Sequence, residues 1–344
     1  MSNPKPFRIA INGYGRIGQC VLRALYENGY RDHLQVVAIN ELSDIDTIAH
    51  LTRYDSTHGR FRGEIDVQGD DLVVNGDRIR VLRHPAPADL PWRLLEVDLV
   101  LECTGAFNDR ATAQKHLDAG AGRLLFSQPA ESDVDRTVVY GINHQELSES
   151  DAIVAAGSCT TNCLVPVVKV LDDAFGVEQG STTTIHAAMN DQPVIDAYHH
   201  QDLRRTRSAL HNIVPVDTGL ARGIERLLPE MEGRFSSVAM RVPTLNVSAI
   251  DMVVNVRKHT SIEQVNDVLK GAAKGALKGI LGYTDELLAS SDFNHDAHSG
   301  VVDGGQTRVT GETMVKVLCW FDNEWGFANR MLDVSQCWLE KTDN

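Results

Sequence analysis

The feature that most constrains this chain is a glycine-rich turn near its N-terminus, directly after an apolar run over residues 7–11. The turn reads Asn-Gly-Tyr-Gly-Arg-Ile-Gly over residues 12–18, and apolar residues then recur at helical spacing over 17–27. Glycines here allow a tight turn from strand to helix and let a pyrophosphate reach the helix N-terminus, where free N–H groups favour negative charge. The pattern predicts a dinucleotide-binding βαβ unit.

An acidic residue lies where such a unit needs one to bind a ribose. Glu41 follows the next predicted strand, residues 35–40, and stands 23 residues after Gly18, close to the usual spacing of about 20. Its carboxylate is expected to accept hydrogen bonds from the ribose hydroxyls and to repel a 2′-phosphate, which predicts NAD rather than NADP. The alternative, a plain glycine-rich turn beside a surface glutamate, is disfavoured by the strand and helix around the turn.

The two halves of the 344-residue chain differ in periodicity, which predicts two domains. Up to about residue 155, short apolar runs alternate with helical patterns, as in a doubly wound parallel α/β sheet; the expected strands are 7–11, 35–40, 72–74, 79–82, 97–102, 123–126, 138–140 and 153–155, with helices at 17–27 and 110–119. The second half is expected to be α+β with a mixed or antiparallel sheet, with strands at 181–187, 236–241, 247–257 and 313–321 and helices at 160–174, 219–228 and 262–277. Pro166 is expected to bend or break the first of these helices.

Composition excludes several classes of partner. Lys and Arg number 33 against 47 Asp and Glu, a formal net charge of −14, which repels nucleic-acid backbones and anionic membrane surfaces. No apolar stretch approaches the roughly 18 residues of a membrane helix, and the six cysteines form no C-x-x-C pair. We therefore expect a cytoplasmic protein without nucleic-acid or membrane partners, in which a local arginine cluster can still bind a small anion.

A cysteine and a histidine are the candidate reactive residues. Cys159, in the run Ser-Cys-Thr-Thr-Asn-Cys over 158–163, is expected at a helix N-terminus, where a thiol is acidified. Cys163 lies one turn further on, but no complementary Cys/His pair follows nearby, so no metal site is predicted. His186 ends a predicted strand 27 residues after Cys159. This spacing leaves open whether the histidine is a catalytic base or a structural residue.

Further motifs make the chain resemble a known family. With the turn at 12–18 and the cysteine motif, Arg-Val-Pro-Thr at 241–244 and Asp-Asn-Glu-Trp-Gly-Phe at 322–327 make the chain resemble the glyceraldehyde-3-phosphate dehydrogenase family over essentially its whole length. Within the family it is most similar to the erythrose-4-phosphate dehydrogenase branch, on the runs 186–192, 196–199, 202–207, 293–296 and 325–327. The resemblance implies a Rossmann-type NAD-binding domain over 1–158, a catalytic domain over 159–323 and a C-terminal helix, about 324–344, packing back on the first domain. It also implies a homotetramer in which the aperiodic segment 192–217 lies near the neighbouring subunit's cofactor.

The resemblance also assigns roles to single residues. It implies that Cys159 is the nucleophile and His186 its base. The cofactor-contacting positions are Gly13, Arg16, Ile17, Glu41, Thr104, Ser127 and Asn323, the last expected to orient the nicotinamide amide. The substrate-binding and anion-binding positions are Ser158, Thr160, Asp191, Arg205, Thr218, Gly219 and Arg241. The chain departs from the three-carbon enzymes at Met189, where they usually carry a threonine hydroxyl and where methionine offers a phosphate no donor.

The implied reaction is the NAD-dependent oxidation of an aldose phosphate through a thioester on Cys159. The branch implies D-erythrose 4-phosphate as substrate, water as acceptor of the acyl group and 4-phosphoerythronate as product, a step feeding pyridoxal 5′-phosphate synthesis. The alternative is a phosphorylating glyceraldehyde-3-phosphate dehydrogenase of glycolysis. A non-catalytic dinucleotide-binding regulatory protein is a further alternative, against which the joint presence of Cys159, His186 and Asn323 argues.

Overall fold

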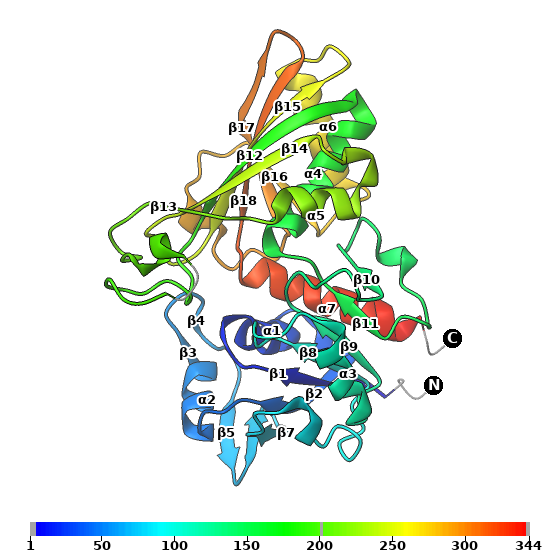
Figure 1. Ribbon diagram of the computed structural model, residues 1–344, viewed down its shortest axis with the longest axis vertical. Coiled ribbons are helices and arrows are strands. Elements are labelled where there is room, and N and C mark those ends of the chain that lie inside the picture. The colour runs from blue at the N-terminus through cyan, green and yellow to red at the C-terminus, as the bar shows by residue number, and fades with distance from the viewer. Residues whose placement is uncertain (1–4, 200–201, 342–344) are drawn as a thin grey trace. The chain divides into compact units, whose positions relative to one another are not determined.

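A computed structural model describes residues 5–199 and 202–341 (Figure 1), so residues 200 and 201 of the aperiodic segment and the last three of the expected C-terminal helix lie outside it. The chain forms two compact units. One comprises the chain up to Ser158 together with the part from Ala328 onward, and the other is Cys159–Phe327. The boundary falls inside helix α7 (Trp325–Glu340), and each unit is built on its own sheet.

The first unit holds a nine-stranded sheet in the order β10-β11-β9-β8-β1-β2-β7-β6-β5. All neighbouring pairs from β10 to β7 are parallel, and only β5 and β6 add antiparallel pairs at one edge, so the predicted doubly wound α/β fold is confirmed. The strands are β1 Phe7–Asn12, β2 Leu34–Asn40, β5 Ile65–Gln68, β6 Asp71–Val74, β7 Asp77–Leu82, β8 Leu99–Glu102, β9 Arg123–Phe126, β10 Arg136–Thr137 and β11 Ile153–Ala155. The helices are α1 Arg16–Glu27, α2 Ile45–Arg53 and α3 Arg110–Asp118, with 3₁₀ turns at Tyr30–Asp32, Pro87–Asp89 and His144–Glu146 and a hairpin of β3 Tyr54–Asp55 and β4 Gly59–Arg60.

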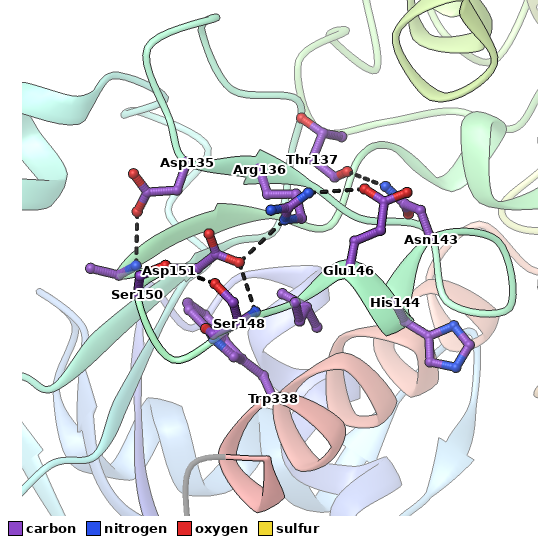
Figure 2. A network of polar contacts seen from close by, with 12 residues as sticks. Asp135, Arg136, Thr137, Asn143, His144, Glu146, Ser148, Ser150, Asp151 and Trp338 are labelled. Carbon is purple, nitrogen blue, oxygen red and sulfur yellow. Dashed lines mark hydrogen bonds and ion pairs between the residues drawn. The ribbon is translucent and has the colours of Figure 1, made fainter.

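One expected strand is misplaced. The apolar run at 138–140 predicts a strand there, but β10 comprises only Arg136–Thr137. The Asn143 side chain donates to the Thr137 carbonyl and accepts from the Val139 N–H, each over 2.9 Å, and so ends the strand (Figure 2). Val139 is nevertheless fully buried, so its apolarity reports burial and not strand pairing.

The part of α7 from Ala328 onward packs on the first unit. The Asn28 side chain donates a 2.6 Å hydrogen bond to Asn329, and the Trp338 indole N–H donates to the Ser148 carbonyl over 3.4 Å (Figure 2). The Arg123 guanidinium lies 5.2 Å from the centre of a Trp338 ring, a cation–π contact. Contacts from both ends of the helix thus hold it against this unit.

The second unit holds a mixed seven-stranded sheet in the order β13-β14-β12-β15-β18-β17-β16. Pairs β12/β14 and β16/β17 are parallel and the others are antiparallel, which confirms the expected mixed sheet. The strands are β12 Val177–His186, β13 Val214–Val216, β14 Phe235–Arg241, β15 Ser248–Val256, β16 Leu281–Thr284, β17 Gly300–Thr310 and β18 Met314–Phe321. The helices are α4 Cys159–Phe175, α5 Leu220–Leu227 and α6 Ile262–Lys274, with 3₁₀ turns at Leu203–Thr206, Pro229–Met231 and Ser290–Phe293.

Helices α4, α5 and α6 lie on one side of this sheet (Figure 1). Buried and more exposed residues alternate along β15 and β18, as expected when one face of a sheet is covered. Helix α4 continues through Pro166, so the expected break there is wrong: Val165, Val167 and Val168 are fully buried, and their packing supports the helix where proline removes one hydrogen bond. In the described parts, 5–199 and 202–341, no helix is long and apolar enough to cross a membrane.

Candidate active site

A cavity of about 360 Å³ opens at the carboxyl ends of β1, β2 and β8. Strand β1 lies between β2 and β8, so the connections leave it in opposite directions at this point, where doubly wound sheets bind nucleotides. The lining residues come from the segments that follow these strands and β7: Asn12, Gly13, Gly15, Asn40, Glu41, Leu42, His84, Pro85, Pro87, Cys103, Thr104, Ala106 and Phe107.

Two glycines of the N-terminal turn are required by close packing. Gly13 has φ +90°, and a Cβ atom there would lie 2.6 Å from the backbone of Thr104. At Gly18 a Cβ atom would lie 2.3 Å from the Gly13 carbonyl oxygen. Helix α1 begins at Arg16 with Gly15 as its N-cap and no capping side chain, so its first turn faces the cavity with backbone groups that suit a pyrophosphate.

The carboxylate of Glu41 is fixed at the cavity wall. Its two oxygens accept hydrogen bonds from the backbone N–H groups of Tyr14, over 2.9 Å, and Leu42, over 2.8 Å. The Arg16 guanidinium pairs with Asp55 at 2.8 Å, so this side chain is engaged within α1 and the β3–β4 hairpin. Ile17 lies in the first turn of α1. The Ser127 N–H continues the β8/β9 ladder by donating to the Glu102 carbonyl over 3.0 Å.

A buried glutamate, which sequence reasoning missed, joins the segments around the cavity. Glu102, 1% exposed at the end of β8, accepts from the Asn12 side chain over 2.6 Å and from both the N–H and the hydroxyl of Thr104. Asn12 in turn accepts a 2.7 Å hydrogen bond from Asn40, at the end of β2. The Trp92 indole donates to Nδ1 of His116, which leaves the proton of neutral His116 on Nε2, 3.4 Å from Glu102.

The second unit brings the candidate reactive pair together. Cys159 is the first residue of α4 and His186 the last residue of β12, and the Cys159 Sγ lies 3.8 Å from His186 Nε2. His186 Nδ1 lies 2.8 Å from the Ala187 carbonyl oxygen. Because a carbonyl can only accept, Nδ1 carries the proton and the lone pair of Nε2 faces the thiol. The spacing left open whether His186 is a base or a structural residue. In the structure its Nε2 lies beside the Cys159 thiol as a proton acceptor, which is the geometry of a base.

Burial dominates the electrostatics of this pair. It lowers the pKa of His186 to about 4, an effect that the Ala187 hydrogen bond opposes and the Arg241 charge reinforces. Burial also raises the pKa of the Cys159 thiol to about 11, against the lowering effects of the Thr160 backbone hydrogen bond and the Arg241 charge. The expectation of an acidified thiol is wrong for this structure, because desolvation outweighs the helix N-terminus. Both groups are neutral near pH 7.

Asn323 is oriented by a hydroxyl that the sequence did not single out. The Ser248 hydroxyl, 1% exposed, accepts a 3.0 Å hydrogen bond from the Ala187 N–H and donates over 2.8 Å to Oδ1 of Asn323. This contact places the carbonyl end of the amide against Ser248 and leaves Nδ2 of Asn323 as a donor. Ser248 thus ties Asn323 to the residue that follows His186.

The candidate anion-binding residues form a cluster with an acidic member. Arg241 ends β14 and is the Cα partner of His186 in the parallel β12/β14 pair. Its guanidinium bonds the Asp191 carboxylate at 2.8 and 3.4 Å, and Arg205 bonds the same carboxylate at 3.1 Å. Met189 is 44% exposed.

The remaining candidate substrate residues lie at helix starts. Gly219 is the N-cap of α5, and the Thr218 hydroxyl accepts from the Leu220 N–H over 3.2 Å. Ser158 directly precedes α4, and Thr160 lies in the first turn of that helix.

The comparisons with known families agree with these two sites. Residues 7–110 match the glyceraldehyde 3-phosphate dehydrogenase NAD binding domain, and residues 158–323 match the glyceraldehyde 3-phosphate dehydrogenase C-terminal domain. The protein is therefore an NAD-dependent dehydrogenase of phosphorylated aldehydes, with NAD as its cofactor. Since it carries both domains in order, it belongs to the glyceraldehyde 3-phosphate dehydrogenase family, as the resemblance predicts.

Proposed function

We propose that this enzyme oxidises D-erythrose 4-phosphate to 4-phosphoerythronate through a thioester on Cys159 that water hydrolyses. The observation that carries the proposal is Met189, which stands three residues after His186 and offers a substrate phosphate no hydrogen-bond donor. A four-carbon aldose phosphate holds its phosphate one carbon further from the aldehyde than a three-carbon one. An enzyme that uses the same cysteine nucleophile on the longer substrate therefore needs its phosphate site in a different place. The absence of a hydroxyl at position 189 supports such a change.

The reactive pair has the geometry for the covalent steps. As the Cys159 sulfur attacks the aldehyde carbon, Nε2 of His186 takes the thiol proton and returns it to the former carbonyl oxygen, giving a hemithioacetal. The same nitrogen takes the hydroxyl proton when the hydride leaves that carbon, and a thioester results. NAD supplies the hydride acceptor. His186 then releases this proton to solvent. In the last step it accepts a proton from water as the new C–O bond forms, and it returns that proton to the sulfur as the C–S bond breaks.

Charge that develops on the reacting oxygen has donors nearby. Cys159 opens α4, so backbone N–H groups of the first helical turn lie beside the sulfur and favour an oxyanion. The remaining donor of Asn323, left free of Ser248, suits the carboxamide of a nicotinamide. Gly13, Gly15 and Glu41 would hold the pyrophosphate and the adenosine ribose.

The test is a paired assay on erythrose 4-phosphate and glyceraldehyde 3-phosphate, each with and without inorganic phosphate. We expect a higher kcat/KM for erythrose 4-phosphate and NADH formation that continues without inorganic phosphate. A preference for glyceraldehyde 3-phosphate that stops when phosphate is withdrawn would establish the glycolytic alternative.

The proposal extends to assembly and location. Apolar side chains are exposed along the aperiodic segment, and they suit contact with further copies of the chain in a homotetramer: Val194, Ile195, Tyr198, Leu203, Leu210 and Ile213. Light scattering of the purified protein tests this assembly, and a monomer would contradict it. All six cysteines are free thiols, which fits the reducing cytoplasm, where the product acid would feed pyridoxal 5′-phosphate synthesis.

A further inference from the structure

One buried carboxylate connects the three strand ends at which the nucleotide cavity opens. Glu102, 1% exposed at the end of β8, accepts a 2.6 Å hydrogen bond from the Asn12 side chain, at the end of β1. Asn12 in turn accepts a 2.7 Å hydrogen bond from the Asn40 side chain, at the end of β2. Asn12, Asn40 and Thr104 line the cavity, and Glu102 lies behind them.

The directions of the two asparagine amides are fixed by backbone groups. Oδ1 of Asn40 accepts from the His84 N–H, and Nδ2 of Asn40 donates to the His84 carbonyl, each over 2.9 Å. Because the backbone offers one donor and one acceptor here, only one orientation of the Asn40 amide satisfies both, and in it Nδ2 donates to Asn12. Asn12 therefore accepts through Oδ1 and must donate through Nδ2. The position that Glu102 occupies needs a hydrogen-bond acceptor.

The same carboxylate holds the segment after β8 against the glycine turn. It accepts from the N–H of Thr104 over 2.9 Å and also from the hydroxyl of that residue. The hydroxyl itself accepts from the Ala106 N–H over 3.1 Å, so residues 104–106 are held together. The Thr104 backbone lies so close to Gly13 that a Cβ atom on Gly13 would stand 2.6 Å from it. A displaced Thr104 would therefore disturb the turn that suits a pyrophosphate.

We infer that Glu102 is a positioning residue for NAD: it holds Asn12, Thr104 and the glycine turn in the arrangement that binds the cofactor. The inference concerns the cofactor and is independent of the proposed substrate. Fully buried side chains close the far side of the carboxylate, with Nε2 of His116 3.4 Å away and the Trp92 indole donating to the other nitrogen of that ring. A lost acceptor would therefore leave buried donors unpaired, and the segments that carry these donors would shift.

The first experiment replaces the carboxylate with an amide of the same shape. In Glu102→Gln only one oxygen remains, so either Thr104 or Asn12 loses its acceptor and faces an NH₂ group instead. Calorimetric titration of the full-length protein with NAD should show binding weakened about tenfold or more, the effect of leaving a buried donor unpaired. Asp98→Asn is the matched control, because Asp98 precedes the same strand and accepts from the Arg8 N–H over 2.7 Å, at the other end of β8. Its NAD affinity should equal that of wild type.

The second experiment exchanges the donor and the acceptor. Asn12→Asp alone places a second carboxylate beside Glu102 and should also weaken NAD binding, because like charges repel. When Asn12→Asp is combined with Glu102→Gln, the new amide can donate to the new carboxylate, which still accepts from Asn40. The double variant should recover most of the affinity that each single variant loses, since the two positions are coupled through one hydrogen bond. Additive losses, or wild-type affinity in a folded Glu102→Gln, would overturn the inference.

Circular dichroism and the melting temperature show whether each variant folds. If Glu102→Gln does not fold, Glu102→Asp takes its place: it keeps the charge, but its shorter side chain cannot reach both Asn12 and Thr104. We expect weaker NAD binding here too, and unchanged affinity in a folded Glu102→Asp would overturn the inference. Because NAD binding is measured without an aldose phosphate, the result does not depend on which substrate the enzyme oxidises.

Discussion

The Sγ of Cys159 lies 3.8 Å from Nε2 of His186, whose other nitrogen is held by the Ala187 carbonyl. The backbone acceptor decides the tautomer, and the tautomer turns the lone pair toward the sulfur. The pair is thus built to pass one proton back and forth, with both members neutral before substrate arrives.

Replacing Cys159 or His186 should impair the reaction and leave NAD binding intact. Cys159→Ala should abolish NADH formation and still bind NAD, because the glycine turn and Glu41 lie in the other unit. His186→Asn should lower kcat by roughly 10²- to 10⁴-fold, the usual worth of a positioned base. Stopped-flow absorbance at the NADH band and fluorescence titration with NAD check both. Substantial turnover by Cys159→Ala would refute the covalent role.

The depressed pKa of His186 should make folding stability depend on pH. Burial, its main cause, lowers the pKa from about 6.5 to about 4, so the unfolded chain binds this proton at a higher pH than the folded one does. Stability from the neutral ring is fully present above about pH 6.5 and is lost as the pH falls toward 4. The free energy of unfolding in urea should therefore drop less from pH 7.5 to 5 in His186→Asn than in wild type. His211→Asn, at an exposed histidine, is the control, and equal drops in all three proteins would contradict the prediction.

Ser248 should act on the cofactor through Asn323. Ser248→Ala removes the donor that holds Oδ1 of Asn323 and leaves the Ala187 N–H without its acceptor. We expect KM for NAD to rise about tenfold or more, the loss typical of one buried hydrogen bond, while the melting temperature falls by a few degrees. Ser248→Thr keeps the hydroxyl and should restore most of the affinity. If the two variants gave the same KM, the hydroxyl would have no positioning role.

Local chemistry made the N-terminal turn and the strand and helix that flank it predictable. The strand, the glycines and α1 lie within about 20 consecutive residues. The apolar run, the glycine positions and the helical spacing can each be read directly from the sequence. The approach of Cys159 to His186 was not predictable from spacing, because it depends on α4 packing on the sheet and on the end of β12. Glu102 and Ser248 were not predicted for a related reason. Glu102 is a single polar residue at the end of β8, and Ser248 is a single polar residue at the start of β15. Only the three-dimensional structure shows which groups their side chains bond.

Strand β17 was not predicted from the sequence, because its residues do not alternate between apolar and polar. Its residues 300–310 include the pair Gly304 and Gly305 and have no regular alternation, so the sequence did not indicate a strand. The pairing with β18 shifts register between Asp303 and Arg308, which places the glycines in an irregular stretch between two paired ends.

Glu41 should control the choice between NAD and NADP. Its carboxylate is fixed by the N–H groups of Tyr14 and Leu42, so it cannot turn away from a 2′-phosphate. Glu41→Ala should weaken NAD and narrow the NAD preference, measured as the ratio of kcat/KM for the two cofactors. Asp46→Asn removes an exposed carboxylate of α2 and should leave the ratio unchanged. Equal use of both cofactors by wild type would disprove the role of Glu41.

The residue at 189 should set the substrate preference. Met189 is 44% exposed and follows His186 by three residues, so a hydroxyl at this position would stand near the site without opening a buried core. Met189→Thr adds the donor that three-carbon enzymes place there and should raise kcat/KM for glyceraldehyde 3-phosphate relative to erythrose 4-phosphate. Because a misplacement of about 1 Å can cost roughly 10²-fold in rate, a single hydrogen bond can move the ratio by a large factor. Full reversal is not expected, since the Asp191 carboxylate still occupies Arg241. Met189→Leu keeps the apolar volume without a donor and should leave the ratio as in wild type; a shift of equal size in both variants would mean that packing, and not the hydroxyl, selects the substrate.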